Sequence, residues 1–255
     1  MEPGLDLHRE GGVATLTLRN PAKRNAMTTE MWRRLPIVLD RLTADGDVRA
    51  LVLTGSGETF CAGADISSLR EGTAPQRLAV AAEEALAAFP RPTLAVVRGH
   101  CVGGGCQLAA ACDLRFAAED ALFGVTPARL GIPYPAAATA RLARLAGPST
   151  AKYLLYSAEL INAERALRVG LVDEVLSADA LPGRVAEFTA TLTARSRLTQ
   201  AVAKEFVDAA SLTAPGGPPG EREAHWAQQA QVSGETAEGV AAFLERRAPA
   251  FPWHP

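Results

Sequence analysis

Continuous apolar runs that end in glycine occur twice in this sequence, as VRALVLTG (Val48 to Gly55) and as RPTLAVVRG (Arg91 to Gly99). A strand that is apolar at every position is buried on both faces of its sheet. Between the two runs, PQRLAVAAEEALAAF (Pro75 to Phe89) has the composition of an alanine-rich helix. A sheet that helices cover on both faces belongs to the α/β class, so we predict an α/β layered core.

Two further elements precede these runs. GVATLTLR (Gly12 to Arg19) alternates apolar and polar residues, which predicts a half-buried strand. A helix is expected from Thr28 onward, because threonine is a favoured N-cap and Met31, Leu35 and the apolar residues after them recur at helical spacing.

The chain after the core has a different character. The tail from Ala178 is mostly helical in pattern, and the segment TAPGGPPGE (Thr213 to Glu221) interrupts it, because glycine and proline cannot continue a helix. This Gly/Pro segment is the only plausible boundary in the pattern between a core and a C-terminal helical piece.

Composition and charge exclude several classes of function. The 255 residues are 48% hydrophobic and carry a formal net charge of −2, with scattered basic residues, which argues against binding to nucleic acid or to a membrane surface through charge. The N-terminus MEPGLDLHREGG is acidic and polar, unlike a signal peptide, and no apolar run approaches the roughly 20 residues that span a bilayer. We expect a cytoplasmic protein.

The four cysteines are Cys61, Cys101, Cys106 and Cys112. They form no C-x-x-C pair, and no histidine cluster accompanies them as in a zinc site. We therefore expect small buried thiols in a reducing compartment, with neither a metal nor a disulfide.

Three consecutive glycines, Gly103 to Gly105, separate the second apolar run from a helical pattern. No lysine follows them as in a Walker loop, and Leu108 stands where a dinucleotide fingerprint needs its third glycine. What remains is a helix N-terminus whose unpaired N–H groups a ligand can approach closely. Tight packing of a helix against a strand is the alternative explanation for the glycines.

A second loop, FCAGADI (Phe60 to Ile66), also follows a buried strand and also offers small residues with free N–H groups. Two such loops can direct two N–H donors at one oxygen, as the stabilisation of an oxyanion such as a thioester enolate requires.

Five segments resemble, in order and spacing, the crotonase superfamily, the enoyl-CoA hydratase/isomerase group: NPAKRNAM, FCAGADI, VRGHCVGGGCQLAAACDLRFA, FGVTPARLGI and EGVAAFLERRAPAF. The resemblance runs from about Leu5 to Phe251. It implies a spiral core of ββα units over residues 1–195 and a C-terminal helical region over residues 196–255 for trimerisation and coenzyme A contacts. The resemblance further implies a homotrimer or homohexamer. It also implies an acyl-CoA thioester as substrate, with coenzyme A as part of that substrate and no permanently bound cofactor.

The resemblance also assigns site residues. The two oxyanion-hole amides correspond to Ala64 and Gly104. The positions that correspond to coenzyme A contacts are Arg24, Ala62, Asp65, Ile66, Phe243 and Arg246. Arg24 corresponds to a contact with the nucleotide or pyrophosphate, and the last two to contacts from the C-terminal helix of the same or a neighbouring subunit. A solvated surface charge is the alternative for each arginine.

The sequence departs from the hydratases at both of their catalytic glutamates, which are replaced by Gln107 and Pro127. Hydration needs one group that takes a proton and one that gives it, and neither an amide nor a proline does so. The two-glutamate mechanism is therefore not available. Gln107 can hold a water or a substrate carboxylate by hydrogen bonds; its alternative is a buried amide bonded to the backbone.

Tyr134 offers one replacement, since it matches a tyrosine of methylmalonyl-CoA decarboxylase-like members, whose Thr-Pro pattern resembles Thr126-Pro127. Decarboxylation gives the same thioester enolate without a base, and Tyr134 would donate the proton. Those members carry histidine at Ala64 and glutamate at Gln107, and Tyr134 as a packing residue is the alternative.

Other candidate acids and bases are Glu71, Glu83, Glu84 and His100. Adjacent glutamates on a helix are usually solvated, which we expect of Glu83 and Glu84, and we expect His100 to be structural. The sequence thus favours an acyl-CoA enzyme of the hydratase/isomerase group that stabilises a thioester enolate. A decarboxylase of a malonyl-type CoA thioester and a non-catalytic acyl-CoA binding protein are the alternatives.

Overall fold

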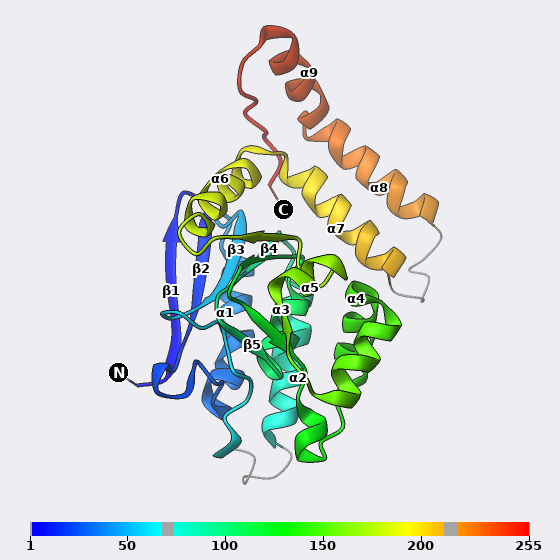
Figure 1. Cartoon of the computed structure of the whole chain (residues 1–255). Helices are drawn as coiled ribbons and strands as arrows, with labels where there is room; N and C mark the ends of the chain where they lie inside the picture. The colour runs from blue at the N-terminus through cyan, green and yellow to red at the C-terminus, as the bar shows by residue number, and fades with distance from the viewer. Residues whose placement is uncertain (1, 68–73, 212–218, 255) are drawn as a thin grey trace.

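A six-stranded sheet forms the first layer of the protein, in a computed structural model that describes residues 2–67, 74–211 and 219–254 (Figure 1). Its strand order is β1-β2-β3-β4-β6-β9, parallel except for β1. The strands are β1 (Gly4–Glu10), β2 (Val13–Arg19), β3 (Ala50–Gly55), β4 (Thr93–Val97), β6 (Leu114–Ala118) and β9 (Glu174–Leu176). The predicted half-buried strand is β2, and the two predicted buried strands are β3 and β4.

The first strand was not anticipated by the sequence pattern. Strands β1 and β2 form a hairpin in which Glu10 pairs with Val13, so Gly11 and Gly12 alone make the turn. Both glycines have positive φ (54° and 81°), the conformation that tight two-residue hairpins require. The Gly-Gly pair followed by an alternating strand was the signal for this hairpin.

A second, three-stranded sheet lies next to the first, in the order β5-β7-β8. Its strands are β5 (His100–Val102), β7 (Leu122–Gly124) and β8 (Ile161–Asn162). The chain repeatedly runs from a strand of the large sheet to a strand of the small sheet and then to a helix, as in β4, β5 and α3 (Gly104–Ala111). The predicted α/β fold of spiralling ββα units is confirmed.

Three helices cover the face of the large sheet that holds the main core: α1 (Thr29–Ala44), α2 (Ala74–Ala87) and α3. The expected N-cap is present, because the Thr28 side chain accepts a hydrogen bond from the N–H of Met31. Two further helices belong to the part of the chain that forms the small sheet: α4 (Ala136–Ser157) connects β7 to β8, and α5 (Ala163–Arg168) follows β8.

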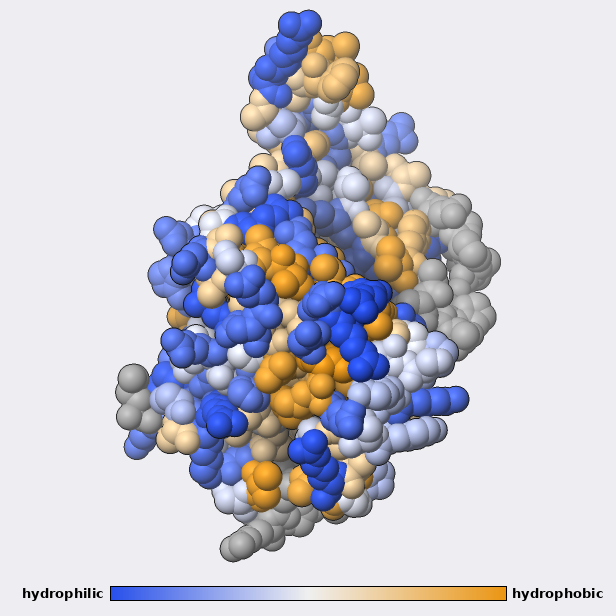
Figure 2. All heavy atoms as spheres, in the orientation of Figure 1, coloured by the Kyte–Doolittle hydropathy of each residue, from blue (hydrophilic) through white to orange (hydrophobic). Residues whose placement is uncertain are grey.

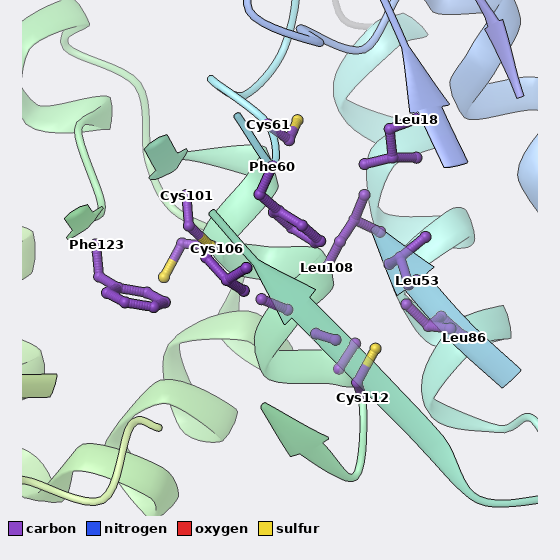
Figure 3. Close-up of a cluster of buried hydrophobic side chains, with 14 of the residues drawn as sticks. Leu18, Leu53, Phe60, Cys61, Leu86, Cys101, Cys106, Leu108, Cys112 and Phe123 are labelled. Atoms are coloured by element: carbon purple, nitrogen blue, oxygen red, sulfur yellow. The ribbon is translucent and has the colours of Figure 1, made fainter. Parts of the chain in front are cut away.

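The four cysteines belong to this core, and Figure 3 shows them among Phe60, Leu108 and other apolar side chains. All four are buried free thiols. Burial raises the pKa of Cys61 and of Cys112 to about 12, so both thiols are protonated and unreactive near neutral pH.

Helix α6 (Leu181–Ala194) covers the opposite face of the large sheet, where Phe188 packs on Phe116 with ring centroids 5.1 Å apart. After it, α7 (Arg197–Ser211) is attached to the core by Lys204, whose Nζ lies 2.9 Å from Oδ2 of Asp113. The predicted boundary at 195/196 coincides with the break between these helices, and the division into two regions stays a prediction.

Helices α8 (Pro219–Val232) and α9 (Glu235–Glu245) extend away from the sheets (Figure 1). Figure 2 shows exposed apolar atoms at the end of the molecule that α9 forms, and Val240, Phe243 and Leu244 are its exposed apolar side chains. Residues 213–218 of the predicted Gly/Pro interruption lie outside the described residues. No helix in the described ranges is long and apolar enough to cross a membrane.

Candidate active site

The two glycine-containing loops are aligned by a backbone pairing between Cys61 and Cys101. The N–H of Cys61 donates to the carbonyl of His100 (2.8 Å), and the N–H of Val102 donates to the carbonyl of Cys61 (2.9 Å). Because the pairing is parallel, the two loops run side by side in the same direction. Ala64 and Gly104 each lie three residues beyond the paired cysteines, which explains why the loops bring these two amides together.

Ala64 and Gly104 lie next to each other, and both line one cavity. A Cβ placed on Gly104 would lie 3.5 Å from the amide nitrogen of Ala64. Within the described part of the chain, neither N–H donates a hydrogen bond to a protein acceptor. Gly104 is the first residue of α3, where a free N–H adds the positive end of the helix dipole.

Each of the three glycines is explained by a different constraint. Gly103 has φ 55° and ψ −116°, a backbone conformation open essentially to glycine alone. A Cβ on Gly104 would meet Trp32, 2.9 Å from its Cζ2 atom. A Cβ on Gly105 would lie 2.2 Å from the carbonyl oxygen of Cys61. Both predicted reasons for the glycines therefore apply: a free helix N-terminus and tight packing.

A cavity of about 500 Å³ opens in front of the two amides. Its walls come from the two loops, α1, α2, the start of α3 and the segment that leads into α4: Trp32, Ala62, Gly63, Ala64, Ile66, Gln76, Arg77, Ala79, Val80, Gly103, Gly104, Gln107, Thr126, Pro127, Leu130, Ile132, Pro133, Tyr134 and Pro135. Among these described residues only Arg77 and Tyr134 ionise, so this part of the wall contains no carboxylate or imidazole that could act as a base.

Gln107 lies on the first turn of α3 and lines the cavity, as predicted. Its Nε2 donates a hydrogen bond to Oε2 of Glu83, which lies on α2 behind the cavity wall. The prediction that Glu83 is solvated is wrong, because its side chain is 0% exposed and forms an ion pair with Arg141 of α4. Burial raises the pKa of Glu83, although the hydrogen bond from Gln107 and the charge of Arg141 act in the opposite direction.

Tyr134 also lines the cavity, in the segment between a short 3₁₀ helix (Pro127–Leu130) and α4. Burial raises the pKa of its phenol, and the neighbouring Cys106 and Glu83 raise it further. The phenol is therefore protonated throughout the physiological pH range and is suited to giving a proton rather than taking one. Pro127, which the resemblance places at the second hydratase glutamate, is part of the same wall.

The residues expected to contact coenzyme A are only partly brought together. Ala62 and Ile66 line the cavity. Asp65 does not; it is nearly buried and accepts hydrogen bonds from Lys23 (Nζ to Oδ2, 2.6 Å) and Ser67. Burial alone would raise the pKa of Asp65, but these bonds outweigh it and the pKa is lowered.

Three of the residues expected to contact coenzyme A lie outside the cavity wall: Arg24, Phe243 and Arg246. Arg24 is exposed in a left-handed turn, and its carbonyl accepts the N–H of Ala62 (3.0 Å). Phe243, 83% exposed, and Arg246 lie on α9 and at its C-cap, and no residue of α9 lines the cavity. Within one chain, the C-terminal helix therefore does not complete the site.

Two of the remaining candidate acids and bases, Glu84 and His100, do not line the cavity. Glu71 lies outside the described residues. Glu84 is half exposed and faces Arg141 at 3.5 Å, as expected of a surface glutamate. His100 lies in β5, and its carbonyl takes part in the pairing with Cys61, but its side chain is not part of the cavity wall.

Sequence reasoning missed Trp32 and Arg77. Trp32 is fully buried at the floor of the site, and its indole N–H has no partner among the described residues. Its position among the apolar residues of α1 was the available signal. Arg77, on α2, is the one cationic side chain among the described residues of the cavity wall. Nothing in its local sequence distinguishes it from a surface charge.

Comparison with known proteins finds close relatives. A model of the family "Enoyl-CoA hydratase/isomerase" matches residues 8–253. A probable enoyl-CoA hydratase of Mycobacterium leprae is 35% identical over 244 residues, which cover 94% of each chain. The short-chain-enoyl-CoA hydratase of Clostridium acetobutylicum is 34% identical over 208 residues, 79% of this chain and 80% of that protein. The crystal structure of an enoyl-CoA hydratase/isomerase family member superposes with a TM-score of 0.93 at 35% identity and covers 100% of this chain and 98% of its own.

Proposed function

Because the chain belongs to the enoyl-CoA hydratase/isomerase family, we propose that it acts on an acyl-CoA thioester and stabilises the thioester enolate with the N–H groups of Ala64 and Gly104. The resemblance to the crotonase superfamily is confirmed by the same comparisons. The relatives support an enzyme that acts on acyl-CoA.

The observation that carries the proposal is the pair of unpaired amides at the cavity wall. A thioester oxygen that accepts hydrogen bonds from both N–H groups would gain negative charge as an enolate forms. The two donors would stabilise that charge. Because the amides are fixed by the pairing of Cys61 with Cys101, they need no reorganisation during the reaction. Removal of one donor from such a site costs about 10²–10³ in rate.

The cavity does not support the two-glutamate hydration mechanism. Gln107 and Pro127 occupy the positions of both glutamates, and the described wall offers no replacement carboxylate. The described wall therefore favours a reaction that forms the enolate without a base.

Decarboxylation of a malonyl-type CoA thioester is the second candidate, and Tyr134 is the observation that favours it. The bond between the α-carbon and the carboxylate would break, its electron pair would form the enolate, and carbon dioxide would leave. The phenol of Tyr134 would then protonate the α-carbon and recover its own proton from water. A phenol whose pKa is raised is protonated when the enolate forms.

We further propose that coenzyme A is bound as part of the substrate, along Ala62 and Ile66 with Arg24 near its phosphates, because an arginine can make charge-assisted bonds to phosphate. Phe243 and Arg246 would contact coenzyme A only across a subunit interface of a homotrimer or homohexamer. The exposed apolar side chains of α9 support such an assembly. Light scattering on the purified protein gives its mass directly, and a monomer would contradict this part.

Product analysis by mass spectrometry tests the reaction. The purified protein is incubated with short and long enoyl-CoAs, 3-enoyl-CoAs and malonyl-, methylmalonyl- and ethylmalonyl-CoA. Release of carbon dioxide that falls in Tyr134→Phe supports decarboxylation, and no release from any malonyl-type thioester contradicts it. A water adduct would show that another residue replaces the lost glutamates. Binding without turnover of any thioester would leave a non-catalytic acyl-CoA binding protein.

A further inference from the structure

Glu83 is a buried carboxylate that the proposed reaction does not use. Its side chain is 0% exposed, and it lies where three helices meet: it belongs to α2, its ion-pair partner Arg141 to α4, and Gln107 to α3. Burying a carboxylate is costly unless partners compensate it, and loss of one partner leaves the other uncompensated. Glu83 nevertheless does not line the cavity, so its effect on a ligand must pass through Gln107.

The chemistry of the two side chains fixes how Gln107 is oriented. An ionised carboxylate only accepts hydrogen bonds, so the NH₂ end of the amide, and not its oxygen, must face Glu83. Burial raises the pKa of Glu83, while the ion pair with Arg141 and the hydrogen bond from Gln107 favour its ionised form. The structure has the expected orientation, because Nε2 of Gln107 donates to Oε2 of Glu83 and Arg141 occupies the other oxygen, Oε1. Other titratable groups near Glu83 are Tyr134, the thiol of Cys106 and the carboxylate of Glu84.

The amide oxygen of Gln107 is consequently left for a ligand. Oε1 of Gln107 accepts no hydrogen bond from a residue that the structure describes, while the side chain lines the cavity. Gln107 lies one helical turn after Gly104, and side chains three positions apart on a helix are neighbours. A thioester whose oxygen is bound at Gly104 would therefore place its next carbons near this acceptor.

We propose that Glu83 is a positioning residue that holds the carbonyl oxygen of Gln107 toward the cavity, and that this oxygen selects acyl-CoA thioesters with a hydroxyl group on a carbon close to the thioester. This inference rests on the proposed binding of acyl-CoA in the same cavity. A carboxylate has no hydrogen to donate to Gln107, so the carboxylate of a malonyl-type substrate would lie away from this side chain. The NH₂ group that could have held such a carboxylate is directed at Glu83 instead.

Calorimetric titration with matched ligands tests the selection. The full-length protein is titrated with butyryl-CoA, 2-hydroxybutyryl-CoA and 3-hydroxybutyryl-CoA, which differ only in the hydroxyl group. One hydrogen bond in such a site is expected to make one hydroxylated ligand bind about 3- to 10-fold more tightly than butyryl-CoA. Equal affinities for all three ligands would overturn the inference and leave the proposed function intact. If none of the three binds, both fail.

Three variants test whether Glu83 is responsible. In Glu83→Gln the neighbour can donate or accept, so the amide of Gln107 is no longer forced into one orientation, and the preference for the hydroxylated ligand is expected to fall below about 2-fold. Glu84→Gln removes the adjacent charge, which also faces Arg141, and is expected to keep the preference. Gln107→Met, similar in volume, is expected to lose it.

The ratio between ligands separates positioning from general damage, because a loosened cavity weakens all three ligands together. In the Gln107→Met background, Glu83→Gln is expected to change the ratio no further. Retention of the preference in correctly folded Glu83→Gln, judged by its circular dichroism, would overturn the role of Glu83.

Discussion

The two sides of the cavity differ in what determines them. On one side, Ala64 and Gly104 supply backbone N–H groups whose positions follow from the pairing of Cys61 with Cys101 and from packing on Trp32. On the other side the wall consists of side chains, among them Gln107 and Pro127, which the resemblance places where the hydratases have their glutamates. In the proposed function the first side, with Ala64 and Gly104, is the oxyanion side and keeps the family pattern. The second side, with Gln107 and Pro127, is the proton-transfer side and departs from that pattern.

This difference follows from how many constraints act on each residue. Each glycine of the oxyanion side is fixed by backbone conformation or by an atom that a Cβ would strike. Among the described residues, the side chain of Gln107 hydrogen-bonds only to Glu83, and a pair of side chains can change without disturbing the backbone. The reaction can therefore change while the fold and the oxyanion hole stay the same.

The largest effect is expected where packing is tightest, in Gly105→Ala. The new Cβ would lie 2.2 Å from the carbonyl oxygen of Cys61, so the backbone of α3 or of the loop Phe60 to Ile66 must move. We expect the free energy of unfolding to fall by about 3 kcal/mol, measured by urea denaturation. The control is Gly183→Ala on α6, where nothing lies within 4 Å of the new Cβ; it should not destabilise. Equal stability of the two variants would contradict the packing argument.

Gly104→Ala should affect turnover more than stability. Its Cβ would lie 2.9 Å from Cζ2 of Trp32, and the displaced amide would lose its alignment with Ala64. We expect kcat to fall by about 10²-fold on whichever thioester the panel identifies as a substrate. Trp32→Phe combined with Gly104→Ala should recover part of the loss relative to Trp32→Phe alone. Undiminished turnover in Gly104→Ala would argue against an oxyanion hole at this position.

Gln107→Glu should destabilise the protein on the proton-transfer side of the cavity, because it places a second carboxylate against Glu83. Two adjacent carboxylates raise the pKa of one of them. Above the unfolded pKa of about 4.3, ionising both carboxyl groups in the folded protein lowers the free energy of unfolding. This loss grows with pH until the raised folded pKa is passed. We therefore expect Gln107→Glu to lose about 1–3 kcal/mol of stability relative to wild type at pH 8, and less at pH 5. Glu83→Gln in the same chain should restore stability at pH 8; a failure to do so would show that the two side chains do not act as a pair.

The smallest effect is expected at Asp65, which follows Ala64. Its ion pair with Lys23 attaches the loop Phe60 to Ile66 to the segment that contains Lys23. The pKa of Asp65 is lowered in the folded protein, so its ionised form stabilises the fold above the unfolded pKa of about 3.9 and this stability is lost as the pH falls through the folded value. Since Lys23 is half exposed, Asp65→Asn should lower the free energy of unfolding by only about 1 kcal/mol at pH 7, measured by urea denaturation, and this difference should shrink as the pH falls through the lowered pKa of Asp65. Asp6→Asn, which breaks the exposed pair with Arg19, is the control and should not alter turnover.

Much of the fold was predictable because local patterns agreed with it. The apolar runs became β3 and β4, Thr28 capped α1, and the alanine-rich segment became α2. The hairpin of β1 and β2 was missed because its first strand is largely exposed, so that its pattern is polar; the glycine pair that makes the turn was the better signal.

The site was predictable as far as its residues follow one another in the sequence. The Ala64 and Gly104 loops and Gln107 could be found from short motifs. Glu83 could not be separated from Glu84 by type, although its spacing from Ala79, Ala82 and Leu86 places it on the apolar side of α2. What decides its burial is Arg141, 58 residues away on another helix, and no local pattern reveals that partner.

Infrared spectroscopy of a thioester with a ¹³C-labelled carbonyl tests the oxyanion hole most directly, since it needs no turnover. Crotonyl-CoA labelled at the thioester carbon is bound at saturation to the wild type and to Gly104→Ala. The account predicts that the carbonyl stretch moves to lower frequency in the wild type, because two N–H donors polarise the bond, and that most of this shift disappears in Gly104→Ala. A carbonyl stretch in the saturated wild-type complex equal to that of the free thioester would contradict the account.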